Sequence, residues 1–131
     1  MDSQKNIELS VVVSDLNLAI SFYCHTLKEF EVFADLQMEH SRLVRLRHRT
    51  IAFGLYLVVP NTEDYKIRFG ARQSSRLAIS LPVDDCEETL ESLASISSPI
   101  LSEIVDAPWG RGFAFEDPFG NRIDAFESYC Y

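Results

Sequence analysis

The chain has 131 residues, 47% of them hydrophobic, which is enough for one well-buried core but short for two independent ones. Its formal net charge of −8 disfavours nucleic acid as a partner, because phosphate backbones are bound by clustered lysine and arginine. No apolar run is long enough for a membrane helix, and residues 1–6 lack the apolar core of a secretory signal, so we expect a cytoplasmic protein without a membrane partner. The cysteines show neither metal nor redox spacing, which indicates reduced thiols at Cys24, Cys86 and Cys130.

The first half of the chain predicts a strand, a helix and three further strands. After a strand near residues 7–13, Asp15 can cap a helix that runs roughly to Leu27. Residues typical of strands then dominate 30–36, 42–47 and 51–59, with a turn at 48–50. We interpret the arginines of this region as the solvated face of a sheet, with an anion-binding strip as the alternative; they are Arg42, Arg45, Arg47 and Arg49.

The second half repeats this pattern. Residues 77–85 lie over residues 7–15 at an offset of 70, which places Ala78 over Glu8, and such self-similarity suggests two copies of one supersecondary unit. Asp85 and Glu88 resemble a capping box at the start of a second helix. Strands are expected over 100–105, 112–116 and 122–127, with a loop at 106–111. The sequence therefore predicts one α+β domain over 1–131, with unit one at about 1–62, a linker at about 63–75 and unit two at about 76–131.

The segment Asp117-Pro118-Phe119-Gly120-Asn121 is a strong signal for the turn of a hairpin, and it places Asp124 inside the strand that follows. This segment resembles the last hairpin of the glyoxalase, bleomycin-resistance and extradiol-dioxygenase superfamily, also called vicinal oxygen chelate proteins, in which the same motif precedes a Glu metal ligand. The strand and helix at 7–23 and the Pro108-Trp109-Gly110 stretch extend the resemblance over nearly the whole chain. It implies two βαβββ units that form curved mixed sheets, a scaffold used both for catalysis and for binding alone.

Side-chain alternation along the strands predicts which residues line a concave surface. If Glu8 faces the cleft, so does Ser10, and the equivalent parity in the other strands selects Tyr56, Ser80, Arg122 and Asp124. Polar groups among apolar residues are what a small-molecule site needs. Trp109 lies in a glycine-containing stretch that we expect to be a mobile loop, where its ring either closes over a planar ligand by stacking or plugs the sheet edge.

The resemblance also implies four positions for metal ligands, and only two of them carry good donors. These positions are Glu8, Tyr56, Ala78 (Leu77 if the register slips by one) and Asp124. A catalytic zinc site normally has three protein ligands, and a non-haem iron site has two histidines and a carboxylate. The histidines lie outside these positions and are expected on the surface; they are His25, His40 and His48. We therefore expect no metal cofactor, with a divalent ion (Mg, Mn, Zn or Fe) at Glu8 and Asp124 as the alternative.

Two functions are compatible with these residues. The first is a metal-independent binding protein of the bleomycin-resistance type, in which a homodimer holds a cationic or aromatic small molecule in a cleft and sequesters a drug. The acidic composition favours a cationic ligand, and the unpaired edges of two curved sheets favour pairing of two copies. The alternative is a divalent-metal-dependent lyase or dioxygenase in which Glu8 or Asp124 acts as ligand or base.

Overall fold

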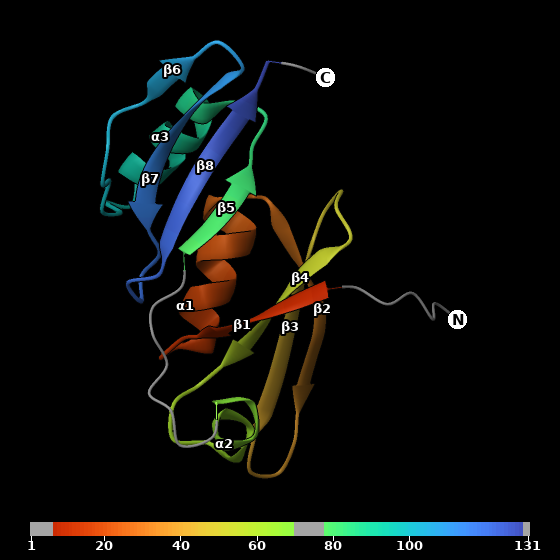
Figure 1. The fold of residues 1–131 in the computed structure, drawn as a ribbon. Coiled ribbons are helices and arrows are strands. Elements are labelled where there is room, and N and C mark those ends of the chain that lie inside the picture. Colours follow the sequence, from red (N-terminus) through yellow and green to blue (C-terminus); the bar gives the residue numbers. More distant parts are fainter. Residues whose placement is uncertain (1–6, 70–77, 130–131) are drawn as a thin grey trace. The chain divides into compact units, whose positions relative to one another are not determined.

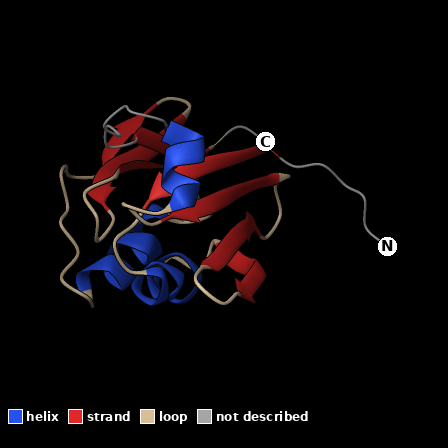
Figure 2. Cartoon of the chain, turned by 90° about the horizontal axis from the view of Figure 1, so that it is seen from below, coloured by secondary structure: helices blue, strands red, loops and turns tan. Residues whose placement is uncertain are grey.

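A computed structural model of the protein describes residues 7–69 and 78–129, and the chain divides into two compact units, Met1–Ser74 and Ser75–Tyr131. Both units have helices and strands (Figures 1 and 2). The elements of the first unit are β1 (Ile7–Val12), α1 (Leu16–Ile20), the π-helix η1 (Ser21–Thr26), β2 (Phe30–Gln37), β3 (Arg42–His48), β4 (Phe53–Val58) and α2 (Glu63–Phe69). Those of the second unit are β5 (Ala78–Pro82), α3 (Cys86–Ala94), β6 (Val105–Ala107), β7 (Gly110–Glu116) and β8 (Arg122–Ser128).

The two sheets have the same topology. Their strand orders are β1-β4-β3-β2 and β5-β8-β7-β6, and in each unit the first strand runs parallel to the last while the other neighbours are antiparallel. The register also agrees, because Ser10 pairs with Tyr56 as Ser80 pairs with Asp124. This arrangement confirms the predicted α+β class with two βαβββ units and mixed sheets. Among the residues described, no helix combines the length and apolar character needed to span a membrane.

The helix after β1 begins as predicted but changes its geometry. Asp15 caps it, since Oδ1 accepts a hydrogen bond of 3.0 Å from the Leu18 amide. After Ile20 the helix widens into η1, closed by a bond of 2.9 Å from the Leu27 amide to the Phe22 carbonyl. Three consecutive side chains of this wider turn are buried, namely Phe22, Tyr23 and Cys24. Asp85 likewise caps α3 by accepting from the amides of Glu87 and Glu88.

The second unit differs from the prediction after α3. Of the strand expected over 100–105, an isolated bridge remains at Ile100 and Val105 begins β6. Between them a hydroxyl replaces part of the ladder, because Ser102 Oγ accepts from the Ala114 amide at 2.9 Å. The loop expected over 106–111 is instead a tight hairpin, in which β6 and β7 are joined by a turn at Pro108 and Trp109. In the first unit, α2 lies in the stretch expected to link the units, where no apolar periodicity signalled a helix.

The expectation that His48 lies on the surface is wrong, whereas His25 and His40 are exposed. The β3–β4 turn wraps around the His48 ring, which is 7% exposed and packs edge-on against Phe30. Its Nδ1 accepts from the backbone amides of Thr50 and Ile51, both at 3.1 Å. The proton therefore resides on Nε2, which donates to the Glu29 carboxylate at 3.0 Å. His48 thus organises a turn and is not available to a ligand.

Candidate functional site

A pocket of about 470 Å³ opens on the face of the second sheet that lies opposite α3. Ile79, Phe115 and Ile123 are buried on the opposite face, which packs against α3, so the alternate residues face the pocket. Its lining includes three residues predicted from strand parity, Ser80, Arg122 and Asp124. The remaining lining residues are Leu81, Pro82, Ser102, Gly112, Phe113, Ala114, Ala125 and Phe126.

The polar side of the pocket is an exposed ion pair. Asp124 Oδ1 accepts from Nε and Nη2 of Arg122 at 3.1 and 3.0 Å, and the two side chains are 41% and 55% exposed. Exposed pairs contribute on the order of 0 to 1 kcal/mol to stability, because water already solvates both charges. A cationic guest can therefore compete with Arg122 for the carboxylate at small cost.

The apolar side of the pocket is the ring of Phe126, which lies against two glycines of the neighbouring strand. A Cβ atom placed on Gly110 would come within 2.6 Å of Phe126 Cζ, and one on Gly112 within 3.5 Å of Cδ1. Because Gly110 and Gly112 have no side chains, the Phe126 ring can pack against the backbone of β7. Pro82, the register partner of Phe126 on β5, flanks it. Strand parity places Phe126 on this face, and two glycines opposite an aromatic residue were the signal that could have identified it as a platform.

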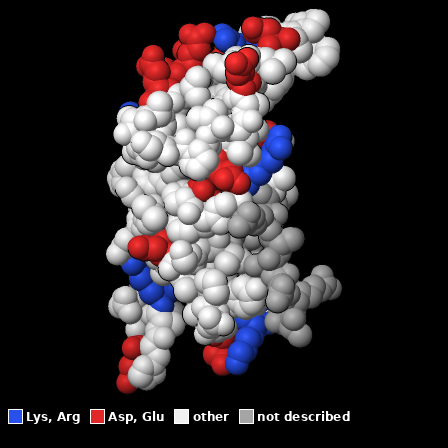
Figure 3. Space-filling model, turned by 90° about the vertical axis from the view of Figure 1, so that its left-hand side faces the viewer, with Lys and Arg blue, Asp and Glu red and all other residues white. Residues whose placement is uncertain are grey.

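The other lining residues predicted from strand parity lie on the first sheet; they are Glu8, Ser10 and Tyr56. Arginine side chains of the same unit contact Glu8 and Tyr56. Glu8 Oε2 accepts from Arg45 Nε at 2.7 Å, and the guanidinium of Arg68, from α2, lies 3.4 Å from the centre of the Tyr56 ring. Ion pairs also occupy other arginines of β3, since Arg42 bonds Asp35 and Arg47 bonds Glu31, both at 2.8 Å. Figure 3 shows basic side chains lying beside acidic ones on the face it presents. Paired arginines of this kind do not form an open anion-binding strip.

Trp109 lies at the tip of the β6–β7 turn and is 61% exposed. The expectation of a glycine loop at this position is wrong, because Gly110 and Gly112 are both strand residues of β7. The Trp109 carbonyl accepts from the Tyr129 amide at 3.0 Å, which fixes the turn to the end of β8. Trp109 is not part of the pocket lining, and closure of its ring over a ligand stays a prediction.

The residues implied as metal ligands do not fit a catalytic divalent metal. Within 7–69 and 78–129, no group of three or more His, Cys, Asp or Glu side chains is placed to hold an ion. Glu8 and Asp124 each bind an arginine, and Tyr56 is stacked under a guanidinium. Ala78 has no donor atom in its side chain, and Leu77 lies outside the described residues. A weak carboxylate–metal contact would have to displace the arginines first.

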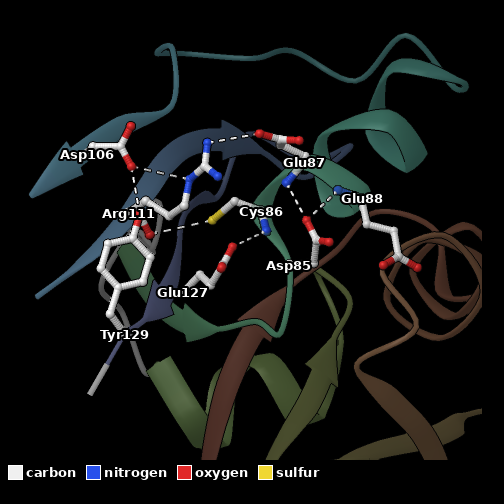
Figure 4. A network of polar contacts seen from close by, with 8 residues as sticks. All are labelled: Asp85, Cys86, Glu87, Glu88, Asp106, Arg111, Glu127 and Tyr129. Atoms are coloured by element: carbon white, nitrogen blue, oxygen red, sulfur yellow. Dashed lines mark hydrogen bonds and ion pairs between the residues drawn. The ribbon is translucent and has the colours of Figure 1, made fainter. Parts of the chain in front are cut away.

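A second polar cluster lies on the face of the second sheet that packs against α3 (Figure 4). Glu127 accepts from the Cys86 amide at 2.9 Å, and Arg111 donates to Glu87 at 3.1 Å, so β7 and β8 are both fastened to the start of α3. Tyr129 donates to Asp106 at 2.7 Å, which ties β6 to the end of β8. Burial raises the pKa of the Cys86 thiol above its usual value, so the thiol stays protonated at neutral pH. This cluster stabilises the fold.

Comparisons with known proteins agree with this architecture. An antibiotic-binding protein, TnmS3 from Streptomyces sp. CB03234, is 26% identical with a TM-score of 0.74, and the match covers 98% of each chain. A glyoxalase/bleomycin resistance protein from the same Streptomyces strain is 28% identical, with a TM-score of 0.71, over 92% of this chain and 98% of the other. A superfamily member from Sphaerobacter thermophilus DSM 20745 is 26% identical, with a TM-score of 0.74, over 95% and 98%. The search of the curated proteins found no significant match. Because the family model matches residues 7–125, the chain belongs to the Glyoxalase/Bleomycin resistance protein/Dioxygenase superfamily.

Proposed function

We propose that the protein binds a planar cationic or aromatic small molecule in the second-unit pocket and sequesters it without converting it. One observation carries this proposal: the Phe126 ring lies on the glycines of β7, and the Asp124 carboxylate stands two residues away on the same face of β8. Residues i and i+2 of a strand are about 7 Å apart. A flat cation can therefore stack on the ring while its charged or donor group meets the carboxylate.

Three further features support this reading. The walls of the pocket combine apolar side chains with the hydroxyl-bearing residues Ser80 and Ser102, a mixture typical of small-molecule sites. The net charge of −8 attracts cations over a longer range. TnmS3, a similar protein over nearly its whole length, is described as antibiotic-binding. The alternative function, a metal-dependent lyase or dioxygenase, needs a set of metal donors that the described residues do not supply.

The test is calorimetric titration of the full chain with proflavine, a planar aromatic cation. We expect saturable binding that Asp124→Asn weakens about tenfold, because the charged acceptor is lost. Glu103→Gln is the matched control, since it removes one negative charge from the same unit at a residue outside this pocket. Equal affinities for the two variants would contradict the assignment to this pocket.

Metal content tests the alternative function on the same preparation. A stoichiometric transition metal in the purified protein, lost in Glu8→Ala or Asp124→Ala, would overturn the reading of a protein that only binds its ligand. We expect elemental analysis to find no such metal.

We also propose that two chains pair as a homodimer. The edge strand β2 exposes apolar side chains, with Val32, Phe33 and Leu36 at 44%, 42% and 56%. An unpaired edge of this kind is readily covered by another chain. Sedimentation equilibrium is expected to give twice the chain mass of 14.9 kDa, and a monomer at every concentration would contradict the pairing.

A further inference from the structure

The net charge of the protein resides in its second unit. Residues 75–131 hold eleven acidic and three basic side chains, whereas residues 1–74 hold nine of each kind. The second unit therefore carries the whole charge of −8, and the first unit is neutral. A field of one sign attracts partners of the opposite sign and repels those of the same sign. A molecule that docks on the second unit is therefore expected to be cationic.

A groove of about 510 Å³ opens between α3 and the segment 100–104, and we call it the α3 groove. Its apolar lining consists of Leu90, Ile100, Leu101 and Ile104. Two of these side chains are open to solvent, since Ile100 is 39% and Leu101 47% exposed. Exposed apolar side chains that gather in one groove are typical of a surface that another molecule covers.

The wall of the α3 groove is held in place by β7. The Leu101 amide donates to the Ala114 carbonyl at 2.8 Å, and Ser102 Oγ accepts from the Ala114 amide at 2.9 Å. The groove is therefore preformed and does not have to open for a partner. It shares Ser102 with the pocket of the proposed function, but the other lining residues of the two hollows differ. The α3 groove is thus a separate surface of the same unit.

Glutamates of α3 flank the groove. Residues three or four apart are neighbours on a helix, so Glu87 lies beside Leu90 and Glu91 lies on the same side one turn later. Glu87 binds Arg111 of β7 at 3.1 Å, whereas Glu91 is exposed and forms no ion pair with the described residues. Glu88 lies about 160° around the helix axis from Leu90 and points away from Arg111 (Figure 4). The carboxylate of Glu91 is therefore free to bind a cation beside the apolar groove.

We propose that the α3 groove is a docking site for a basic amphipathic helix of a partner protein. Aliphatic side chains of that helix fill the groove, and the lysine or arginine next to them pairs with Glu91. The acidic field of the second unit steers the helix to this surface. The same field disfavours anionic membranes and nucleic acids as occupants. This proposal does not rest on the ligand of the proposed function.

The experiment titrates the full chain into a fluorescein-labelled helical peptide of leucine and lysine, with leucines along one face and lysines along the other. Fluorescence anisotropy is expected to show saturable binding. A peptide of the same composition in scrambled order has no apolar face, and it is expected to bind about tenfold more weakly. Equal binding of the two peptides would reveal a general attraction between opposite charges and would rule out the docking site.

Two pairs of matched variants locate the site. Leu101→Ser is expected to weaken binding of the leucine–lysine peptide about fivefold to 30-fold, because an apolar contact is lost. Its control is Ile96→Ser, since Ile96 is 48% exposed in the same unit but does not line the groove. Glu91→Gln is expected to weaken binding about twofold to fivefold, and Glu88→Gln less. A loss no larger in Leu101→Ser or Glu91→Gln than in its control would place the peptide elsewhere and refute the proposal.

Sedimentation equilibrium distinguishes a partner protein from a second copy of this chain. Leu101→Ser is expected to have the same mass in solution as the wild type, because no second copy occupies the α3 groove. A smaller mass for Leu101→Ser would show that another chain of the same protein covers this groove, and the proposed partner helix would then be wrong.

Discussion

Replacing Asp117 with alanine is expected to destabilise the second unit by about 3 to 5 kcal/mol, because several buried donors lose a charged acceptor. Asp117 is 2% exposed and its Oδ1 accepts from the amides of Phe119 and Asn121 at 2.9 and 2.8 Å. Its Oδ2 accepts from Asn121 Nδ2 at 2.8 Å. The carboxylate therefore holds together the turn that joins β7 to β8.

Urea denaturation followed by Trp109 fluorescence measures this loss, since Trp109 is the single tryptophan of the chain and belongs to the second unit. Pro118→Ala is the control, because Pro118 is exposed in the same turn, and we expect a change within about 1 kcal/mol. In Asp117→Asn, an amide group that can only donate replaces the carboxylate oxygen and faces the Nδ2 donor of Asn121. Adding Asn121→Asp supplies an acceptor at position 121, so a donor and an acceptor face each other again. If the double variant is no more stable than Asp117→Asn alone, the side-chain bond is not the source of the stability.

Replacing Phe126 with alanine is expected to weaken the binding of a planar aromatic cation about 10- to 100-fold. The estimate corresponds to about 1.5 to 3 kcal/mol for an aromatic surface that the ligand no longer covers. Phe126→Tyr keeps the ring and is expected to bind within about threefold of wild type, as a mostly volume-conserving change. Calorimetry with proflavine provides the affinities.

The control for this series is Ile96→Ala, which removes another partly exposed apolar side chain of the second unit after the end of α3. Circular dichroism of each variant checks that the sheet is intact. An unchanged affinity in Phe126→Ala would show that the ligand does not stack on this ring, independently of the result for Asp124→Asn.

The features predictable from the sequence are those that repeat along it. The offset between Glu8 and Ala78 gave the two units, and alternation along the strands placed Ser80 and Asp124 on one face, where the register joins them. Asp15 and Asp85 were recognisable as caps because capping depends on local hydrogen bonds. Such signals need no knowledge of tertiary contacts.

The features that escaped prediction depend on contacts between distant residues. Helix α2 has no buried residue, so no apolar period marks it, and Arg68 is anchored by a ring on β4. His48 is buried because backbone amides of the next turn point at its ring. The role of Phe126 depends on two glycines of another strand, and their effect becomes visible only when the strands are paired.

The parallel pairing of first and last strands has a consequence for how the chain is made. In the second sheet, β8 lies between β5 and β7, so those strands have no common neighbour until residues 122–128 have left the ribosome. In a nascent chain that stalls after the Asp117 turn, β5 and β7 would each have an unpaired edge exposed to other chains, and unpaired strand edges promote aggregation. Vectorial synthesis thus leaves this sheet incomplete until β8 is made, and we expect a chain that ends before residue 122 to aggregate.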